Sequence, residues 1–135
     1  MSDCIFCKIV AGESPNYTVY EDENFLAFLD IFPHALGHTV LIPKVHHDNF
    51  MELTEIEVQQ LSVALKKTME RIKEVLNPDS FNVGWNEGPV AGQTIPHLHI
   101  LIFPRYKGDG GGSVHSIIKN PSTIPVSEVA EKFKK

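Results

Sequence analysis

The sequence has little of three things: excess positive charge, long apolar runs and cysteine. Its 12 lysines and arginines stand against 17 aspartates and glutamates, so the formal net charge is -5. An acidic chain does not attract nucleic acid or an anionic membrane by its overall charge. No uncharged apolar run approaches the roughly 20 residues of a bilayer-spanning helix, and residues 1–4 do not begin a signal peptide. We therefore expect a cytoplasmic protein with no nucleic-acid or membrane partner.

The 2 cysteines, Cys4 and Cys7, stand so close together that they cannot cross-link distant segments of a secreted scaffold. The length of 135 residues suits one hydrophobic core and is too short for two, so we expect a single domain over 1–135, with 106–135 as a glycine-rich loop and C-terminal tail. Histidine is abundant instead. Six of the 7 histidines form three tight pairs, which are His34 and His38, His46 and His47, and His97 and His99.

Hydrophobic patterning predicts an α+β fold. One long helix begins at Thr54, where residues 54–57 form a capping box, and Asn77 with Pro78 ends it. Its apolar stripe consists of Leu61, Leu65, Met69, Ile72 and Leu76. The strand-like segments are 18–21, 25–29, 39–42, 81–85 and 97–103. Strands, one long helix and then strands indicate a largely antiparallel sheet with the helix across one face.

The segment 97–103 carries the clearest chemical signal. Side chains alternate along a strand, so His97, His99 and Leu101 share one face, and the two imidazoles stand about 7 Å apart. This spacing suits one shared site. A half-exposed strand with two solvated histidines is the alternative interpretation.

The turn-rich loop 86–94 leads directly into this strand. Its backbone N–H groups, with the side chains of Gln93 and Thr94, offer the donors that hold a phosphate. An imidazole beside a bound phosphate can attack phosphorus as a nucleophile. Loop and strand together predict phosphoryl or nucleotidyl transfer through a phosphohistidine-type intermediate.

Four stretches of the chain together resemble the histidine-triad (HIT) superfamily of nucleotide hydrolases and transferases. They are 4–9, 27–31, 37–46 and 92–105, which occur in the family's order. The chain is most similar to the small bacterial HIT hydrolases. The resemblance implies a HIT-like fold, with a five-stranded antiparallel sheet, one long helix and a short N-terminal helix, and it implies a homodimer.

The resemblance also gives individual residues a role. His99 matches the nucleophile that attacks the α-phosphate and becomes nucleotidylated, and His38 matches a buried histidine behind it. Asp30 matches the acid that accepts hydrogen bonds from the ribose hydroxyls. Positions that hold phosphate match Asn86, Gln93 and Thr94, and apolar walls of the nucleobase pocket match Phe6, Ile9 and Ile31. The implied ligand is a purine nucleotide of the AMP or GMP type.

One position departs from the family pattern. The third histidine of the triad, two residues beyond the nucleophile, is Leu101 here. The missing imidazole normally helps the leaving group to depart, and the loss of such a group typically costs roughly 10²–10⁴-fold in rate. A transferase branch carries glutamine at this position, but leucine can neither donate nor accept. Three explanations stay open: an inactivated variant, a divergent member with altered activity, and a descendant that only binds.

Cys4 and Cys7 form a C-x-x-C pair outside the βαβ setting that a redox motif needs. Two small buried side chains are the alternative without a metal. Several HIT-like proteins bind zinc through such a pair and two histidines, and the matching histidines are His46 and His97, with His47 ranked second. The resemblance thus implies a closed structural Zn²⁺ site. It would pin the N-terminal segment to the catalytic strand and leave His97 unavailable as an acid or base.

The leading prediction is a HIT-type hydrolase of nucleoside phosphoramidates or dinucleoside polyphosphates, impaired by Leu101. The alternative is a purine-nucleotide-binding protein with the same pocket and little or no turnover. A third function, a zinc-stabilised interaction module, leaves the loop 86–94 and Asp30 without a purpose.

Overall fold

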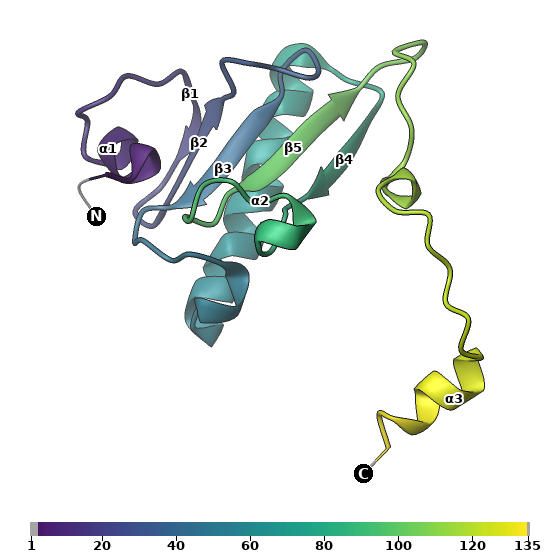
Figure 1. The fold of residues 1–135 in the computed structure, drawn as a ribbon. Helices are drawn as coiled ribbons and strands as arrows, with labels where there is room; N and C mark the ends of the chain where they lie inside the picture. The colour runs from purple at the N-terminus through teal and green to yellow at the C-terminus, as the bar shows by residue number, and fades with distance from the viewer. Residues whose placement is uncertain (1–2, 135) are drawn as a thin grey trace.

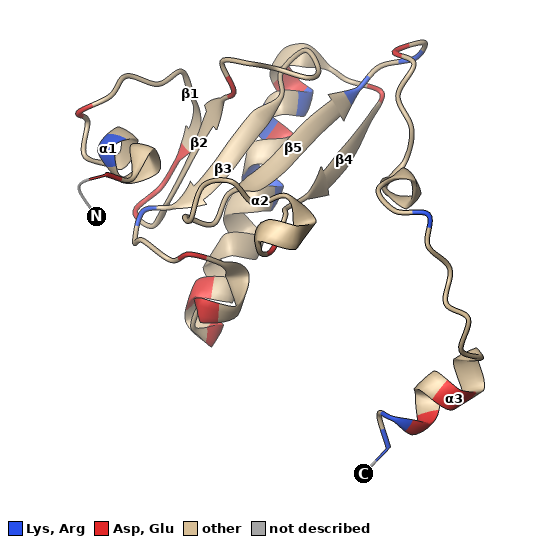
Figure 2. Cartoon of the chain, viewed as in Figure 1, with Lys and Arg blue, Asp and Glu red and all other residues tan. Residues whose placement is uncertain are grey.

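Residues 3–134 are described by a computed structural model, in which the strands form one antiparallel sheet (Figure 1). Its strands are β1 (Thr18–Glu21), β2 (Phe25–Leu29), β3 (Thr39–Pro43), β4 (Ser80–Gly84) and β5 (Ile100–Arg105), in the order β1-β2-β3-β5-β4. The predicted α+β fold with a five-stranded antiparallel sheet is confirmed. Charges avoid the sheet: the strands carry Glu21 and Arg105 at their ends and no other charged residue, as Figure 2 shows.

The long helix α2 (Glu55–Leu76) crosses one face of the sheet (Figure 1). The capping box is present: the Thr54 hydroxyl accepts from the Glu57 N–H, and the Glu57 carboxylate accepts from the Thr54 N–H. The helix ends at Asn77, which has a left-handed backbone with φ 49°. Its buried residues are Leu61, Ala64, Thr68 and Ile72. The apolar three of these pack on the sheet and its approach, at Phe25, Ala27, Leu41, Leu98, Ile100 and Ile102.

The short helix α1 (Ile5–Val10) lies on the opposite side of the sheet and buries Phe6. Phe6 joins a second apolar cluster with Leu26, Phe28, Val40 and Ile42, so the short N-terminal helix is confirmed. Short 3-10 turns complete the body at η1 (Phe50–Glu52) and η2 (Pro89–Ala91). Beyond β5, the chain passes through η3 (Val114–Ser116), leaves the body, and ends in α3 (Val126–Glu131) (Figure 1). No helix among residues 3–134 has the length and apolarity to cross a membrane.

The predicted strand 97–103 starts later than expected, at Ile100. The backbone before it makes other bonds: the His97 N–H donates to Ile95 O at 2.8 Å, and the Leu98 N–H donates to His47 O at 2.7 Å. The alternation of faces still holds, because Leu98 and Ile100 are buried toward α2. The two histidines therefore stand on an irregular approach to the strand, beside the segment that carries His46.

Candidate active site and metal centre

Four side chains from three parts of the chain meet at α1. They are Cys4, Cys7, His46 and His97, whose ligand atoms all lie within 4.8 Å of one another. The Cys4 Sγ is 3.3 Å from the His97 Nδ1, and the Cys7 Sγ is 3.2 Å from the His46 Nδ1. A tetrahedral site with ordinary zinc–nitrogen and zinc–sulfur bonds has ligand separations of about 3.3–3.8 Å. The four side chains are therefore spaced as a donor set that can hold a metal ion.

The outer nitrogens of the two imidazoles support this assignment. The His97 Nε2 donates to Pro43 O at 3.0 Å, and the His46 Nε2 donates to the Asp48 Oδ1 at 3.0 Å. Because both partners are acceptors, each neutral ring carries its proton on Nε2 and presents a lone pair at Nδ1. The two Nδ1 atoms are 3.2 Å apart. Two facing lone pairs repel each other, and a cation between them removes that repulsion.

Burial acts on the protonation of this cluster. It lowers the pKa of His97 to about 4, so the ring stays neutral and fit to coordinate. Burial also raises the pKa of the Cys7 thiol, and the neighbouring Cys4 adds to the effect. A bound cation favours the thiolate and opposes this rise. The donor set thus fits a metal that takes sulfur and nitrogen ligands.

His99 stands next to the cluster with one nitrogen fixed. Its Nδ1 donates to the backbone carbonyl of His97 at 2.8 Å, which leaves a lone pair on Nε2. The ring packs on Phe6 with centroids 5.1 Å apart, and Phe6 also meets the edge of His97 at 5.6 Å. Phe6 therefore holds both imidazoles, and the tautomer of His99 is the one a nucleophile at Nε2 needs.

His38 is buried, and one of its nitrogens lacks a partner. The His34 backbone N–H donates to the His38 Nδ1 at 3.2 Å, so the neutral ring carries its proton on Nε2. That Nε2 makes no hydrogen bond within residues 3–134 and lies 3.7 Å from the Asp30 Oδ2. Burial lowers the pKa of His38, and the nearby Asp30 opposes the shift. The ring also stacks on Phe103 with centroids 4.3 Å apart.

Leu101 lies diagonally across the sheet from His38. Its pairing partner on β3 is Val40. His38 lies two residues before Val40 in the sequence, and its side chain is on the same face of the sheet. Aromatic side chains reach across such a diagonal. A histidine at position 101 would therefore be within reach of the unpartnered His38 Nε2, and leucine is not able to meet it.

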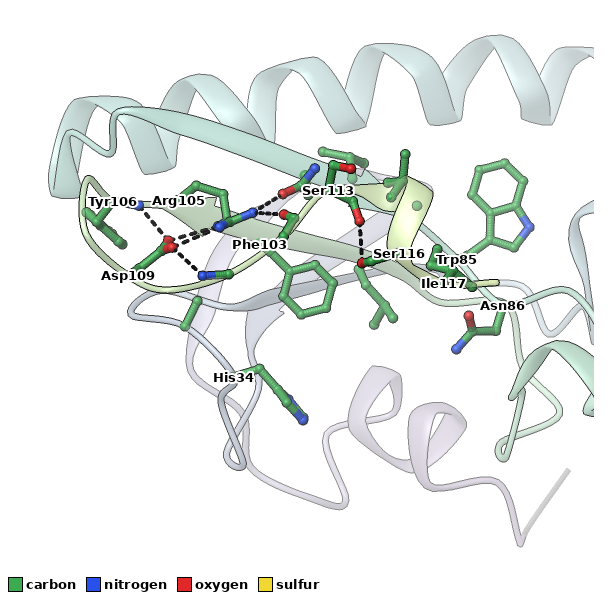
Figure 3. A pocket seen from close by; sticks show the side chains of 18 of the residues that line it. His34, Trp85, Asn86, Phe103, Arg105, Tyr106, Asp109, Ser113, Ser116 and Ile117 are labelled. Atoms are coloured by element: carbon green, nitrogen blue, oxygen red, sulfur yellow. Dashed lines mark hydrogen bonds and ion pairs between the residues drawn. The ribbon is translucent and has the colours of Figure 1, made fainter. Parts of the chain in front are cut away.

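A cavity of about 630 Å³ lies between the outer face of β4 and β5 and the segment 111–117 (Figure 3). Residues along it include His34, Trp85, Asn86, Leu101, Phe103 and Ile117. Arg105 and Asp109 stand at one end and Asn86 at the other (Figure 3). Of the predicted site residues, the structure brings Asn86 and Leu101 to this cavity. The remaining ones, His99 among them, lie outside its walls.

The tail is fastened over the cavity by Arg105. Its guanidinium donates to both carboxylate oxygens of Asp109 at 2.8 Å and to the Asn82 Oδ1 at 2.6 Å, and it also reaches Gly112 O. Arg105 holds the pKa of the Asp109 carboxyl well below its usual range. The family-motif arginine therefore closes a turn in the chain, and its charge is neutralised there.

The side-chain amide of Gln93 makes hydrogen bonds within the protein. Its Nε2 donates to Asp48 O at 2.7 Å and Ile95 O at 3.0 Å, and its Oε1 accepts from the Gly88 N–H at 2.9 Å. Both amide protons are used, so a phosphate contact by Gln93 requires one of these bonds to open. In this arrangement the side chain shapes the loop, whereas Thr94 is exposed.

The predicted nucleotide-binding residues near α1 are only partly enclosed. Ile9 is half-buried against the second cluster, and Ile31 is 70% exposed. The Asp30 Oδ1 accepts from the Phe32 N–H at 2.8 Å, and its other oxygen faces His38. Ile31 is therefore open to solvent, and Asp30 is partly so.

Asp48 and Glu87 were not singled out in the sequence. The Asp48 carboxylate accepts from the His46 Nε2 and its backbone carbonyl accepts from Gln93, and the Glu87 carboxylate accepts from three N–H groups. An acid two residues beyond a ligand histidine was the available signal for Asp48. Nothing in the pattern around Glu87 distinguishes it from a solvated loop residue.

Residues 11–108 match the family model described as the HIT domain. The chain belongs to the HIT family. An uncharacterized HIT-like protein of Methanocaldococcus jannaschii is 44% identical over 131 residues, which are 97% of this chain and 98% of that one. An adenylylsulfatase of Arabidopsis thaliana is 40% identical over 108 residues, 80% of this chain and 55% of that one.

Two solved HIT structures are similar in fold and bear on the ligands. A zinc-bound histidine triad protein from Mycobacterium smegmatis has a TM-score of 0.75 at 37% identity, over 81% of this chain and 79% of that one. A hypothetical histidine triad nucleotide-binding protein from Sulfolobus tokodaii has a TM-score of 0.75 at 39% identity, over 88% and 77%. The family resemblance seen in the motifs is therefore confirmed.

Proposed function

We propose that this HIT protein is a purine nucleotide hydrolase or nucleotidyl transferase that acts at an α-phosphate through His99. The observation that carries the proposal is the bond of 2.8 Å from the His99 Nδ1–H to His97 O, because it leaves Nε2 as the nucleophile. The nucleotide-binding and adenylylsulfatase relatives support a nucleotide ligand.

In the proposed reaction, the His99 Nε2 forms a bond to the α-phosphorus as the bond to the leaving group breaks. Asn86 and the backbone N–H groups of the loop 86–94 stabilise the charge on the phosphate oxygens. Water then cleaves the phosphorus–nitrogen bond and releases the nucleoside monophosphate. The substrates are phosphoramidates or dinucleoside polyphosphates of AMP or GMP type. Asp30 receives the ribose hydroxyls, and Phe6, Ile9 and Ile31 form the wall for the base.

The metal site has a structural role in this proposal. Cys4, Cys7, His46 and His97 would hold Zn²⁺, which stabilises the thiolates and ties the N-terminal segment to the approach of β5. Phe6 follows Cys4 closely, so the same cage places the base wall beside His99. His97 then serves as a ligand and takes no part in proton transfer.

A second candidate, nucleotide binding with little or no turnover, is favoured by one observation. With Leu101, the buried His38 Nε2 has no hydrogen-bond partner within residues 3–134, and position 101 brings no proton donor to the cavity. Binding would be retained in such a protein while departure of the leaving group is slow.

Single-turnover incubation with adenosine 5′-phosphoramidate separates the two candidates. The proposed enzyme accumulates an acid-labile adenylyl group on His99 and then releases AMP. His99→Ala abolishes the adduct, whereas the matched control His115→Ala, at an exposed histidine, retains it. AMP binding with no adduct and no release would establish the second candidate.

The homodimer, the cytoplasmic location and the single domain over 1–135 stay predictions. Light scattering coupled to size-exclusion chromatography measures the first, and a mass of one chain in solution would contradict it.

A further inference from the structure

We propose that Glu87 is a positioning residue of the loop 86–94, whose carboxylate fixes the backbone of Asn86 and so sets the affinity for nucleotide phosphate. The inference rests on the proposed function, because the role of Asn86 as a phosphate ligand belongs to it. What is new is that the position of Asn86 depends on the Glu87 carboxylate, which does not itself contact the phosphate.

Both carboxylate oxygens of Glu87 are used as acceptors. Oε1 accepts from the Phe50 N–H at 3.0 Å and from the Trp85 Nε1–H at 3.0 Å, and Oε2 accepts from the Met51 N–H at 3.1 Å. Phe50 and Met51 belong to η1, which is remote in sequence from the loop. Hydrogen bonds to a charged acceptor are about twice as strong as neutral ones. Glu87 therefore binds the loop to η1 through three charge-assisted bonds.

Asn86 stands between the two residues that this arrangement fixes. Trp85 on one side stacks on Phe50 with ring centroids 4.9 Å apart, and Glu87 is on the other. The Asn86 amide makes no hydrogen bond within residues 3–134 and faces the cavity (Figure 3). A Cβ atom at Gly92, which has φ +108°, would lie 3.4 Å from the Asn86 Nδ2, so glycine leaves that space to the Asn86 amide. The direction of the amide therefore depends on the Asn86 backbone, because no hydrogen bond within residues 3–134 holds the side chain.

The arrangement requires a carboxylate rather than an amide. Three N–H donors converge on two oxygens, so Glu87→Gln would turn an NH₂ group toward at least one of them. An N–H group that faces another donor loses its hydrogen bond but still pays the free-energy cost of its desolvation. Glu87→Gln preserves the size of the side chain and removes the negative charge, which makes it the sharpest perturbation. Glu70→Gln is the matched control, because Glu70 is an exposed partner of Lys66 on α2.

The experiment measures AMP affinity by calorimetry and the emission of Trp85, which is the chain's 1 tryptophan. Glu87→Gln is expected to weaken AMP binding about tenfold and to shift Trp85 emission to the red, while Glu70→Gln leaves both unchanged. In the background of Asn86→Ala, Glu87→Gln is expected to add no further loss of affinity, because its effect passes through Asn86. The red shift, which does not depend on Asn86, is expected to persist in that background.

Unchanged AMP affinity in Glu87→Gln overturns the inference, and so does a tenfold loss that is equally large without Asn86. If Glu87→Gln does not fold, Trp85→Phe removes one donor and keeps a ring on Phe50, and AMP affinity is expected to fall about threefold. Unaltered affinity in that variant also overturns the inference. A wild-type protein that binds AMP and forms no adduct on His99 contradicts the proposed function alone.

Discussion

Leu101→His is the substitution that tests the site most directly. Position 101 lines the cavity and lies diagonally from His38, whose buried Nε2–H makes no hydrogen bond to any residue in the described range 3–134. An imidazole there accepts from His38 and presents its other nitrogen to the leaving group. We expect turnover of a phosphoramidate to rise by about 10²-fold or more, since general acids typically contribute about 10²–10⁴-fold.

Stability is expected to change little in this variant. Leu101 is half-buried against the cluster around Phe6, so its replacement costs about 1 kcal/mol of apolar burial. A new hydrogen bond to a buried donor returns about 1 kcal/mol. The two terms nearly cancel, and Tm is expected to stay within about 3 °C of the parent protein.

The assay compares kcat for release of a fluorescent amine from its AMP phosphoramidate across three variants. Leu101→His supplies a donor and a partner for His38, Leu101→Gln supplies a donor without a titratable proton, and Leu101→Met conserves size and apolarity. Rates are expected to fall in that order, with Leu101→Met at the level of the parent. A Leu101→His protein that folds, binds AMP and shows the parent's kcat would refute the role assigned to position 101.

Three other outcomes follow from the structure. Asp48→Ala is expected to lower zinc affinity about 10–100-fold, measured in competition with a chelator. Asp48→Asn is expected to retain most of that affinity, because its amide oxygen still accepts from His46. Equal affinity of both variants and the parent protein would contradict the role of Asp48 in orienting the His46 ring. Burial and the bond to Asp22 raise the pKa of Tyr20 to about 12, so the bond is present at neutral pH and its stabilisation is lost as pH rises from about 10 to 12. Absorbance titration at the phenolate band should show a late-titrating group that Tyr20→Phe removes. Arg105→Lys lacks the planar guanidinium that bonds both oxygens of Asp109, so limited proteolysis within 106–117 is expected to be faster than in the parent protein. An unchanged cleavage rate would show that Arg105 does not hold this segment in place.

Most of the fold could be predicted because its signals are local. The capping box at Thr54 and the αL residue Asn77 set the ends of α2, and runs of β-branched or aromatic residues bounded by turns set β1 and β2. The start of the strand was predicted at residue 97 instead of Ile100 because an alternating pattern reports on side chains and not on backbone hydrogen bonds. There the alternation continues although the backbone of Leu98 bonds to His47.

The site was predicted less completely, because its finer parts depend on contacts between distant segments. The motif located His99 and the four metal-cluster residues, and the structure brings those four together. It did not show that the Gln93 amide donates to the backbone carbonyls of Asp48 and Ile95. It also did not show that the Glu87 carboxylate accepts hydrogen bonds from the backbone of η1. Such roles are decided by which backbone groups lie nearby, and a single sequence does not carry that information.

His97 belongs to two structures at once: its ring faces the cysteines, and its carbonyl holds the proton of His99. Under the proposed function, metal content and catalytic competence would therefore be coupled in any preparation. Zinc would tie the His97 ring, and through it the carbonyl that His99 bonds, to the N-terminal segment. Rates are best expressed per metal-loaded chain.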